Sequence, residues 1–251
     1  MSSAVPRPHK QTDPAPSRPG GRPRANTAAH LVYRALRDEI VSMRRKPGEP
    51  IVEREIALAH GVSRTPVSEA LLRLAGEELV DIFPQSGTFV ARIPVAALPE
   101  AILMRTALEQ TTARLAAERA GAGQLARLRE LIDRQRRVEA RNDGNRFHEA
   151  DEAFHAAIAE AAGHPGIWRF IEQVKIQVDR YRRLTLPVPG RMRRVLKEHA
   201  AIVAAIEAHD GPGAADAMAA HLEALRASIG DVRDLNPDYF VDGTVAVAAS
   251  A

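Results

Sequence analysis

The chain has 251 residues, of which 45% are hydrophobic, 4% aromatic and 27% charged, and it contains no cysteine. The length has room for two modest domains, and the composition favours helices and excludes disulfides, zinc–thiolate sites and thiol catalysis. No apolar run approaches the roughly 18 residues that span a bilayer, and the N-terminus lacks the apolar block of a signal peptide. We therefore expect a cytoplasmic protein with no membrane segment.

The net charge of +3 is concentrated in the first 27 residues, which carry five basic residues and one acidic residue. This segment is rich in Pro, Arg, Ser and Gly, so residues 1–27 are expected to form a disordered basic tail. Such a tail either stays in solvent or contacts phosphates. Because the rest of the chain is nearly neutral, a nucleic-acid function has to be argued from particular residues and not from total charge.

Residues 28–93 are predicted to form a small domain of three helices and a hairpin. Apolar residues recur every four positions from Val32 to Ile40, which indicates a helix that stops before the breaker Lys46-Pro47-Gly48. A short helix fits residues 53–60 and ends at Gly61. Ser63 then stands where an N-cap is expected, and the next helix buries one stripe, formed by Val67, Ala70, Leu71 and Leu74.

Two short strands follow, over residues 79–83 and 88–91, around a tight turn that ends at Gly87. Helix, short helix, turn, helix and hairpin are the elements of a winged helix-turn-helix. In that fold the helix after Gly61 enters the major groove of DNA.

From residue 94 the pattern indicates an antiparallel bundle, because short loops with breakers separate successive amphipathic helices. Residues 94–230 are assigned to this domain, and residues 231–251 are expected to fray. The fold class is mainly α. The six expected helices span residues 97–120, 123–142, 145–162, 165–185, 190–209 and 213–229.

The head resembles that of GntR-family transcription factors over the run PGEPIVEREIALAHGVSRTPVSEALLRLAGEELVDIFPQSGTFVA, residues 47–91. The segment GVSRTPV, residues 61–67, is its most specific part. The bundle resembles the FCD ligand-binding domain of the FadR branch, and six helices resemble the smaller VanR-type subgroup. The marks of that domain are Arg105 with Glu109, Asp151 with His155, His199 and His221.

Two positions depart from the family pattern. Ser68 stands in the recognition helix where the family usually has an arginine that often touches DNA, which puts the operator or the strength of this contact in doubt. Val52 stands where Ser or Thr often caps the short helix. Val is a poor cap and costs about 1 kcal/mol, which Glu53 in the first turn partly offsets.

The DNA contacts are expected at the start of the recognition helix and at the wing. Arg64 and Thr65 face the groove if the apolar stripe faces the core, and arginine can bind guanine O6 and N7 together. Arg54 is placed for a phosphate contact, and Gly87 lets the wing backbone approach the minor groove. The family uses the matching positions in these ways. The full expected set is Arg54, Ser63, Arg64, Thr65, Ser68 and Gly87.

Asp151 and His155 are four residues apart, so both project from one helix face, while His199 and His221 lie on two later helices. Spacing alone leaves these histidines open to structural or solvated roles. The resemblance implies that the four residues bind a divalent metal, for which Zn²⁺ fits best and Ni²⁺, Fe²⁺ or Mn²⁺ would also serve. It also implies that Arg105 binds a carboxylate effector. The alternative for Arg105 is an ion pair with Glu109 within the helix.

The resemblance further implies a homodimer on a pseudo-palindromic operator, acting as a repressor that a small organic acid releases. Acid binding would favour one arrangement of the bundle and so change the separation of the two heads. The sequence leaves two other functions open. One is a hydrolytic enzyme at the metal, for which no motif identifies a general base, and the other is an architectural DNA-binding protein without an effector.

Overall fold

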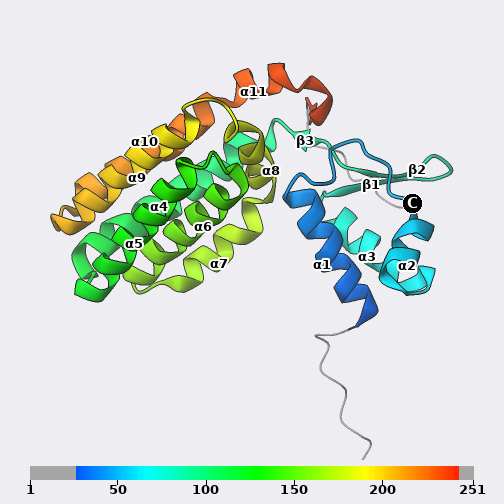
Figure 1. Cartoon of the computed structure of the whole chain (residues 1–251), viewed down its shortest axis with the longest axis horizontal. Coiled ribbons are helices and arrows are strands. Elements are labelled where there is room, and N and C mark those ends of the chain that lie inside the picture. The colour runs from blue at the N-terminus through cyan, green and yellow to red at the C-terminus, as the bar shows by residue number, and fades with distance from the viewer. Residues whose placement is uncertain (1–26, 243–251) are drawn as a thin grey trace, which may run out of the picture.

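The computed structural model describes residues 27–242 and divides them between a small head and a larger helical bundle (Figure 1). The expectation of a disordered tail concerns residues that, apart from Thr27, lie outside this range. No helix in the described part is long and apolar enough to cross a bilayer.

The head packs three helices into one core. α1 (Ala28–Val41) begins at Thr27, whose side chain accepts a hydrogen bond from the amide of His30. α2 (Glu53–His60) and α3 (Arg64–Gly76) are joined at Gly61, whose φ of 62° is a left-handed conformation that glycine adopts without strain. The core is formed mainly by Val32, Leu36, Ile40, Ile56, Val67, Leu71, Leu74 and Leu79.

The wing is an antiparallel hairpin of β1 (Val80–Phe83) and β2 (Gly87–Val90), with Phe83 paired to Gly87. The φ of Gly87 is 114°, which a residue with a side chain rarely adopts. The predicted winged helix-turn-helix is therefore confirmed.

Ser63 departs from the prediction in one detail. It occupies the N-cap position of α3 with an extended backbone, but its side chain makes no capping hydrogen bond. The residue is exposed, so water competes for its hydroxyl. Val52 is the N-cap residue of α2 and also makes no side-chain hydrogen bond, as expected because valine has no polar side-chain atom.

Seven helices form the bundle in the described residues, where the sequence predicted six. The predicted helix over 165–185 is interrupted at Lys175, whose φ and ψ are −91° and 3°. Neither glycine nor proline marks this break, so the sequence did not reveal it. The mainly α fold class is confirmed, and the VanR-type subgroup is not confirmed. The helices are α4 (Ala97–Arg119), α5 (Ala122–Glu139), α6 (Gly144–Ala161), α7 (Pro165–Val174), α8 (Ile176–Thr185), α9 (Arg191–Glu207) and α10 (Gly211–Ala227).

The sequence predicted fraying over residues 231–251; residues 231–241 are folded, and residues 243–251 lie outside the described range. α11 (Ile229–Leu235) leads through a 3₁₀ turn (Pro237–Tyr239) to β4 (Phe240–Val241). β4 pairs in parallel with β3 (Ile93–Pro94), the linker between head and bundle. The side chain of Phe240 is buried in the bundle core, which anchors this short strand.

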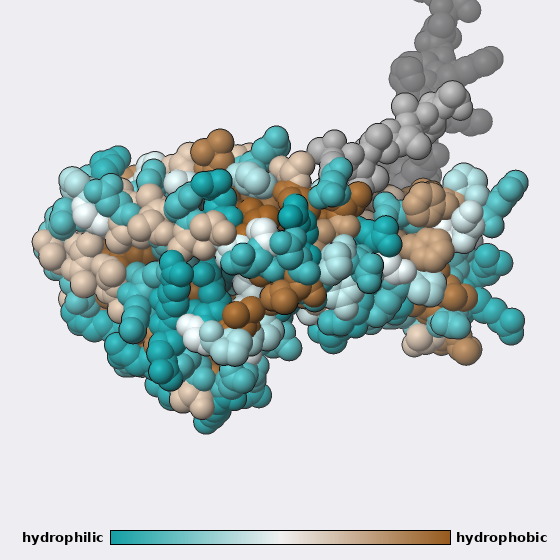
Figure 2. Space-filling model, turned by 90° about the horizontal axis from the view of Figure 1, so that it is seen from above, coloured by the Kyte–Doolittle hydropathy of each residue, from teal (hydrophilic) through white to brown (hydrophobic). Residues whose placement is uncertain are grey.

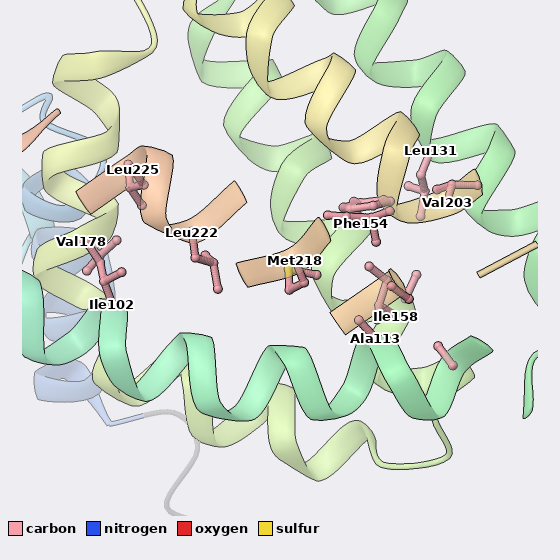
Figure 3. Close-up of a cluster of buried hydrophobic side chains, with 14 of the residues drawn as sticks. Ile102, Ala113, Leu131, Phe154, Ile158, Val178, Val203, Met218, Leu222 and Leu225 are labelled. Atoms are coloured by element: carbon pink, nitrogen blue, oxygen red, sulfur yellow. The ribbon is translucent and has the colours of Figure 1, made fainter. Parts of the chain in front are cut away.

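The bundle core runs between α4, α6, α9 and α10. Figure 3 shows side chains from these helices and from α5 and α8 meeting around Phe154, Met218 and Leu222. Three buried alanines, Ala113, Ala116 and Ala117, let neighbouring helices approach α4 closely. The face of the molecule in Figure 2 is mostly hydrophilic over the bundle, with hydrophobic residues gathered near the junction with the head.

Candidate metal centre and nucleic-acid interface

The structure brings together the four residues that were expected to bind a metal. Asp151 and His155 come from α6, His199 from α9 and His221 from α10, and one ligand atom of each lies within 4.8 Å of the others. The Nε2 atom of His199 lies 3.3 Å from Nε2 of His221 and 3.5 Å from Asp151 Oδ1. His155 Nε2 lies 3.7 Å from Asp151 Oδ2. All four residues are buried.

The Nδ1 atom of each imidazole ring lies close to a side-chain oxygen of another residue. His155 Nδ1 lies 2.5 Å from Glu109 Oε2, and His221 Nδ1 lies 2.8 Å from Glu198 Oε2. His199 Nδ1 lies 2.9 Å from the side-chain oxygen of Gln135. When Nδ1 of His199 and of His221 donates to its partner oxygen, the lone pair of the same ring's Nε2 points into the group, whereas the close contact of His155 with Glu109 lacks hydrogen-bond geometry. Metal-binding histidines are held in this way by outer carboxylates and carbonyls.

The protonation of the group suits a cation. Burial lowers the pKa of His199 well below its ordinary value, and burial also lowers the pKa of His221. Both rings are therefore neutral near pH 7. Burial alone would raise the pKa of Asp151, but the guanidinium of Arg182 holds that pKa well below the usual range. Imidazole nitrogens and a carboxylate can together hold a divalent metal of intermediate softness.

Arg182 was not anticipated from the sequence. Its guanidinium, on α8, donates to both carboxylate oxygens of Asp151, with Nη2 lying 2.6 Å from Oδ1. A cation that takes one of these oxygens has to displace an Arg182 donor or share the carboxylate with it. Gln135 and Glu198 were also missed, because their partners lie on other helices and no spacing connects them.

Arg105 has features of both expected roles, the ion pair with Glu109 and the binding of a carboxylate effector. Its Nε lies 2.6 Å from Glu109 Oε1, four residues along α4. Its Nη1 and Nη2 atoms are buried and have no hydrogen-bond partner among the described residues. Glu109 also contacts His155, so the pair of Arg105 and Glu109 adjoins the four-residue group.

The outer residue Glu198 allows a direct prediction. Replacing it with alanine frees the His221 ring, and loss of such an outer partner typically lowers metal affinity about 10- to 100-fold. Competition with a chromophoric chelator measures this change. Glu207→Ala is the matched control, since Glu207 lies on the same helix but pairs with Arg129 at the surface. Equal affinity in the Glu198 and Glu207 variants would contradict the role of Glu198.

α2 and the β1–β2 hairpin, which carry Arg54 and Gly87, lie at the end of the head away from the bundle (Figure 1). Arg54, Ser63, Thr65 and Gly87 are exposed, and the side chain of Arg64 is 75% exposed. Ser68 is half-buried, and its hydroxyl donates to Glu53 Oε2 at 3.1 Å. Arg64 Nη2 lies 3.4 Å from the same oxygen. An exposed pair of this kind is weak, so Arg64 remains free to turn toward a ligand.

Comparison with known proteins agrees with both halves of this description. Residues 28–90 match the family described as "Bacterial regulatory proteins, gntR family", and residues 100–224 match the FCD domain. The chain is 33% identical over 209 residues to the HTH-type transcriptional repressor RspR of Escherichia coli, covering 83% of this chain and 92% of the relative. An uncharacterized HTH-type regulator in an unstable DNA locus of Streptomyces ambofaciens is also 33% identical, over 86% of this chain and 91% of that protein.

Two solved structures share the fold. Escherichia coli McbR/YncC aligns with a TM-score of 0.68 and 24% identity over 82% of this chain and 98% of its own. A transcriptional regulator from Rhodococcus sp. RHA1 aligns with a TM-score of 0.63 and 25% identity over 81% and 97%. The relatives are regulators and not enzymes, which removes the hydrolytic alternative. The chain belongs to the gntR family of bacterial DNA-binding transcriptional regulators, with an FCD effector domain.

Proposed function

We propose that the protein is a repressor that binds a pseudo-palindromic operator as a homodimer and is released by a small organic acid. The acid would bind at a divalent metal, best Zn²⁺, held by Asp151, His155, His199 and His221. Repression is supported by the relative RspR, which is itself a repressor. The metal is supported by the inward Nε2 atoms and their outer partners.

The strongest support for an acidic effector is the guanidinium of Arg105. A buried guanidinium with two unpartnered nitrogens is costly, because each unsatisfied buried donor costs about 1–3 kcal/mol, or more when it is charged. A carboxylate accepts two parallel N–H bonds from arginine, so an organic acid would satisfy both nitrogens. A second oxygen of the acid would then reach the metal.

Coupling to DNA would pass through α8. Near its start, Gln177 donates to the backbone oxygen of Glu78 at 3.1 Å, and Arg180 donates to the backbone oxygen of Ala91, both in the head or its linker. Near its end, Arg182 holds the carboxylate of Asp151. A change at the metal group therefore acts on a helix that also holds the head, and small helix shifts of this kind move whole domains.

Dimer formation is supported by exposed apolar side chains on two adjoining helices. Leu103 and Met104 on α4 are 69% and 41% exposed, and Phe170 on α7 is 51% exposed. Burying such side chains contributes about 1.5–3 kcal/mol each, which favours a second copy covering this face. The DNA contacts would be made by Arg54, Ser63, Arg64, Thr65, Ser68 and Gly87.

A thermal-shift screen tests the effector site. Sugar acids, dicarboxylates, hydroxy acids and amino acids are added to the full chain with and without Zn²⁺. An acid at 100 times its Kd should raise the Tm by roughly 5–10 °C, and only when Zn²⁺ is present. Arg105→Gln should abolish the shift. Arg114→Gln is the matched control, because Arg114 forms an exposed pair with Glu118 at the same spacing on the same helix.

The proposal fails if no acid shifts the Tm with Zn²⁺ present. It also fails if Arg105→Gln responds as strongly as Arg114→Gln.

A further inference from the structure

A second group of buried polar side chains lies between α6 and α8, apart from the four-residue group. His148 and Glu152 are four residues apart on α6, and Asp179 lies in the first turn of α8. One ligand atom of each lies within 4.8 Å of the others. His148 and Asp179 are more than nine-tenths buried.

Lys175, at the break between α7 and α8, holds one oxygen of each carboxylate. Its ammonium contacts Glu152 Oε2, and it lies 2.5 Å from Asp179 Oδ2. The other oxygens, Glu152 Oε1 and Asp179 Oδ1, are buried and have no hydrogen-bond partner in the described structure, and the same holds for His148 Nδ1. Each of the three side chains thus keeps one buried polar atom without a hydrogen-bond partner among the described residues.

The two carboxylate oxygens accept only, and a neutral imidazole offers one nitrogen lone pair, so the three side chains can together supply three ligand atoms. A cation accepts all three lone pairs at once. The pattern in which one carboxylate oxygen is held by a neighbouring side chain while the other is free is also that of metal-binding carboxylates.

The charges favour the same conclusion. Two carboxylates and one ammonium leave the group with a net negative charge. Lys175 contacts one oxygen of each carboxylate and leaves Glu152 Oε1 and Asp179 Oδ1 without a partner among the described residues. Arg182 Nη1 lies 3.9 Å from Glu152 Oε1, but that guanidinium is committed to both oxygens of Asp151.

We propose that His148, Glu152 and Asp179 form a second cation site, with Lys175 orienting the two carboxylates. One imidazole and two carboxylate oxygens are a harder ligand set than the three imidazoles and one carboxylate of the first group. It would therefore prefer Mn²⁺ or Mg²⁺ where the first group prefers Zn²⁺. A cation there would tie α6 to α8, the helix that contacts the head.

Electron paramagnetic resonance with Mn²⁺ as the probe tests this site in the full chain. Chelator-treated protein is first given an equivalent of Zn²⁺, and Mn²⁺ is then titrated while the free aquo-ion signal is counted. Wild type should bind Mn²⁺ in a saturable step, with a ¹⁴N modulation from one imidazole. Asp179→Asn and His148→Ala should each lose that step. Glu149→Gln, which changes an exposed acid between His148 and Glu152, should keep it.

The result is separable from the metal centre proposed above. A His199→Ala and His221→Ala double variant should still bind Mn²⁺ at the second site, even if it binds no Zn²⁺. If Zn²⁺-loaded wild type takes up no Mn²⁺, Lys175 alone balances the carboxylates and the proposal is wrong. It is equally wrong if folded Asp179→Asn and His148→Ala, verified by circular dichroism, bind Mn²⁺ as wild type does.

Discussion

Replacing His199 and His221 together with alanine should remove the tightly bound Zn²⁺ of the bundle. Wild-type protein purified without added metal should carry about one equivalent of Zn²⁺, since four protein ligands bind this ion firmly. The double variant keeps Asp151 and His155, and two ligands four residues apart on one helix do not retain a metal through purification. Elemental analysis by mass spectrometry measures the difference.

The matched control replaces two histidines outside the group. His60 is exposed at the end of α2, and His164 is exposed at the start of α7, where it contacts Arg119. A variant with His60→Ala and His164→Ala should keep the wild-type Zn²⁺ content. Equal and negligible Zn²⁺ in wild type and both variants would contradict the metal centre.

Arg64→Ala should remove most of the discrimination between operator and unrelated DNA. A good bidentate contact to guanine is worth about 1–3 kcal/mol, and a symmetric dimer makes it in each half-site, so the loss is doubled. The operator is obtained by selection from random duplexes with the wild-type protein. Fluorescence anisotropy then compares its Kd with that of scrambled DNA at physiological salt.

Two other arginine variants are compared with Arg64→Ala. Arg54→Ala should weaken binding to both duplexes alike and lower the salt slope by about one per lost phosphate contact. Arg73→Ala should behave as wild type, because Arg73 lies toward the other end of α3 with its guanidinium 3.6 Å from the Tyr33 ring. Undiminished discrimination in Arg64→Ala would exclude Arg64 from base recognition.

The head could be predicted well from the sequence because its signals are local. The Gly61 turn, the apolar stripe of α3 and the Gly87 turn each depend on a few consecutive residues. The capping bond of Ser63 was the exception, since an exposed hydroxyl can bond to water as well as to the backbone.

The candidate metal ligands could be proposed from residue type and resemblance, but their surroundings could not. Gln135 lies 64 residues from His199, and Arg182 lies 31 residues from Asp151. Only the packing of α5, α6, α8 and α9 brings these pairs together. The helix break at Lys175 could not be predicted from the sequence for a related reason. At this break Lys175 contacts Glu152 and Asp179, and no turn-forming residue in the sequence indicates the break.

The control of DNA binding by the bundle is tested most directly by one titration. Zn²⁺-loaded wild type is bound to its selected operator, and the acid with the largest thermal shift is added while anisotropy reports the bound fraction. The acid should release the operator from wild type but not from Arg105→Gln. Operator affinity that stays constant at saturating acid would instead indicate a DNA-binding protein without an effector.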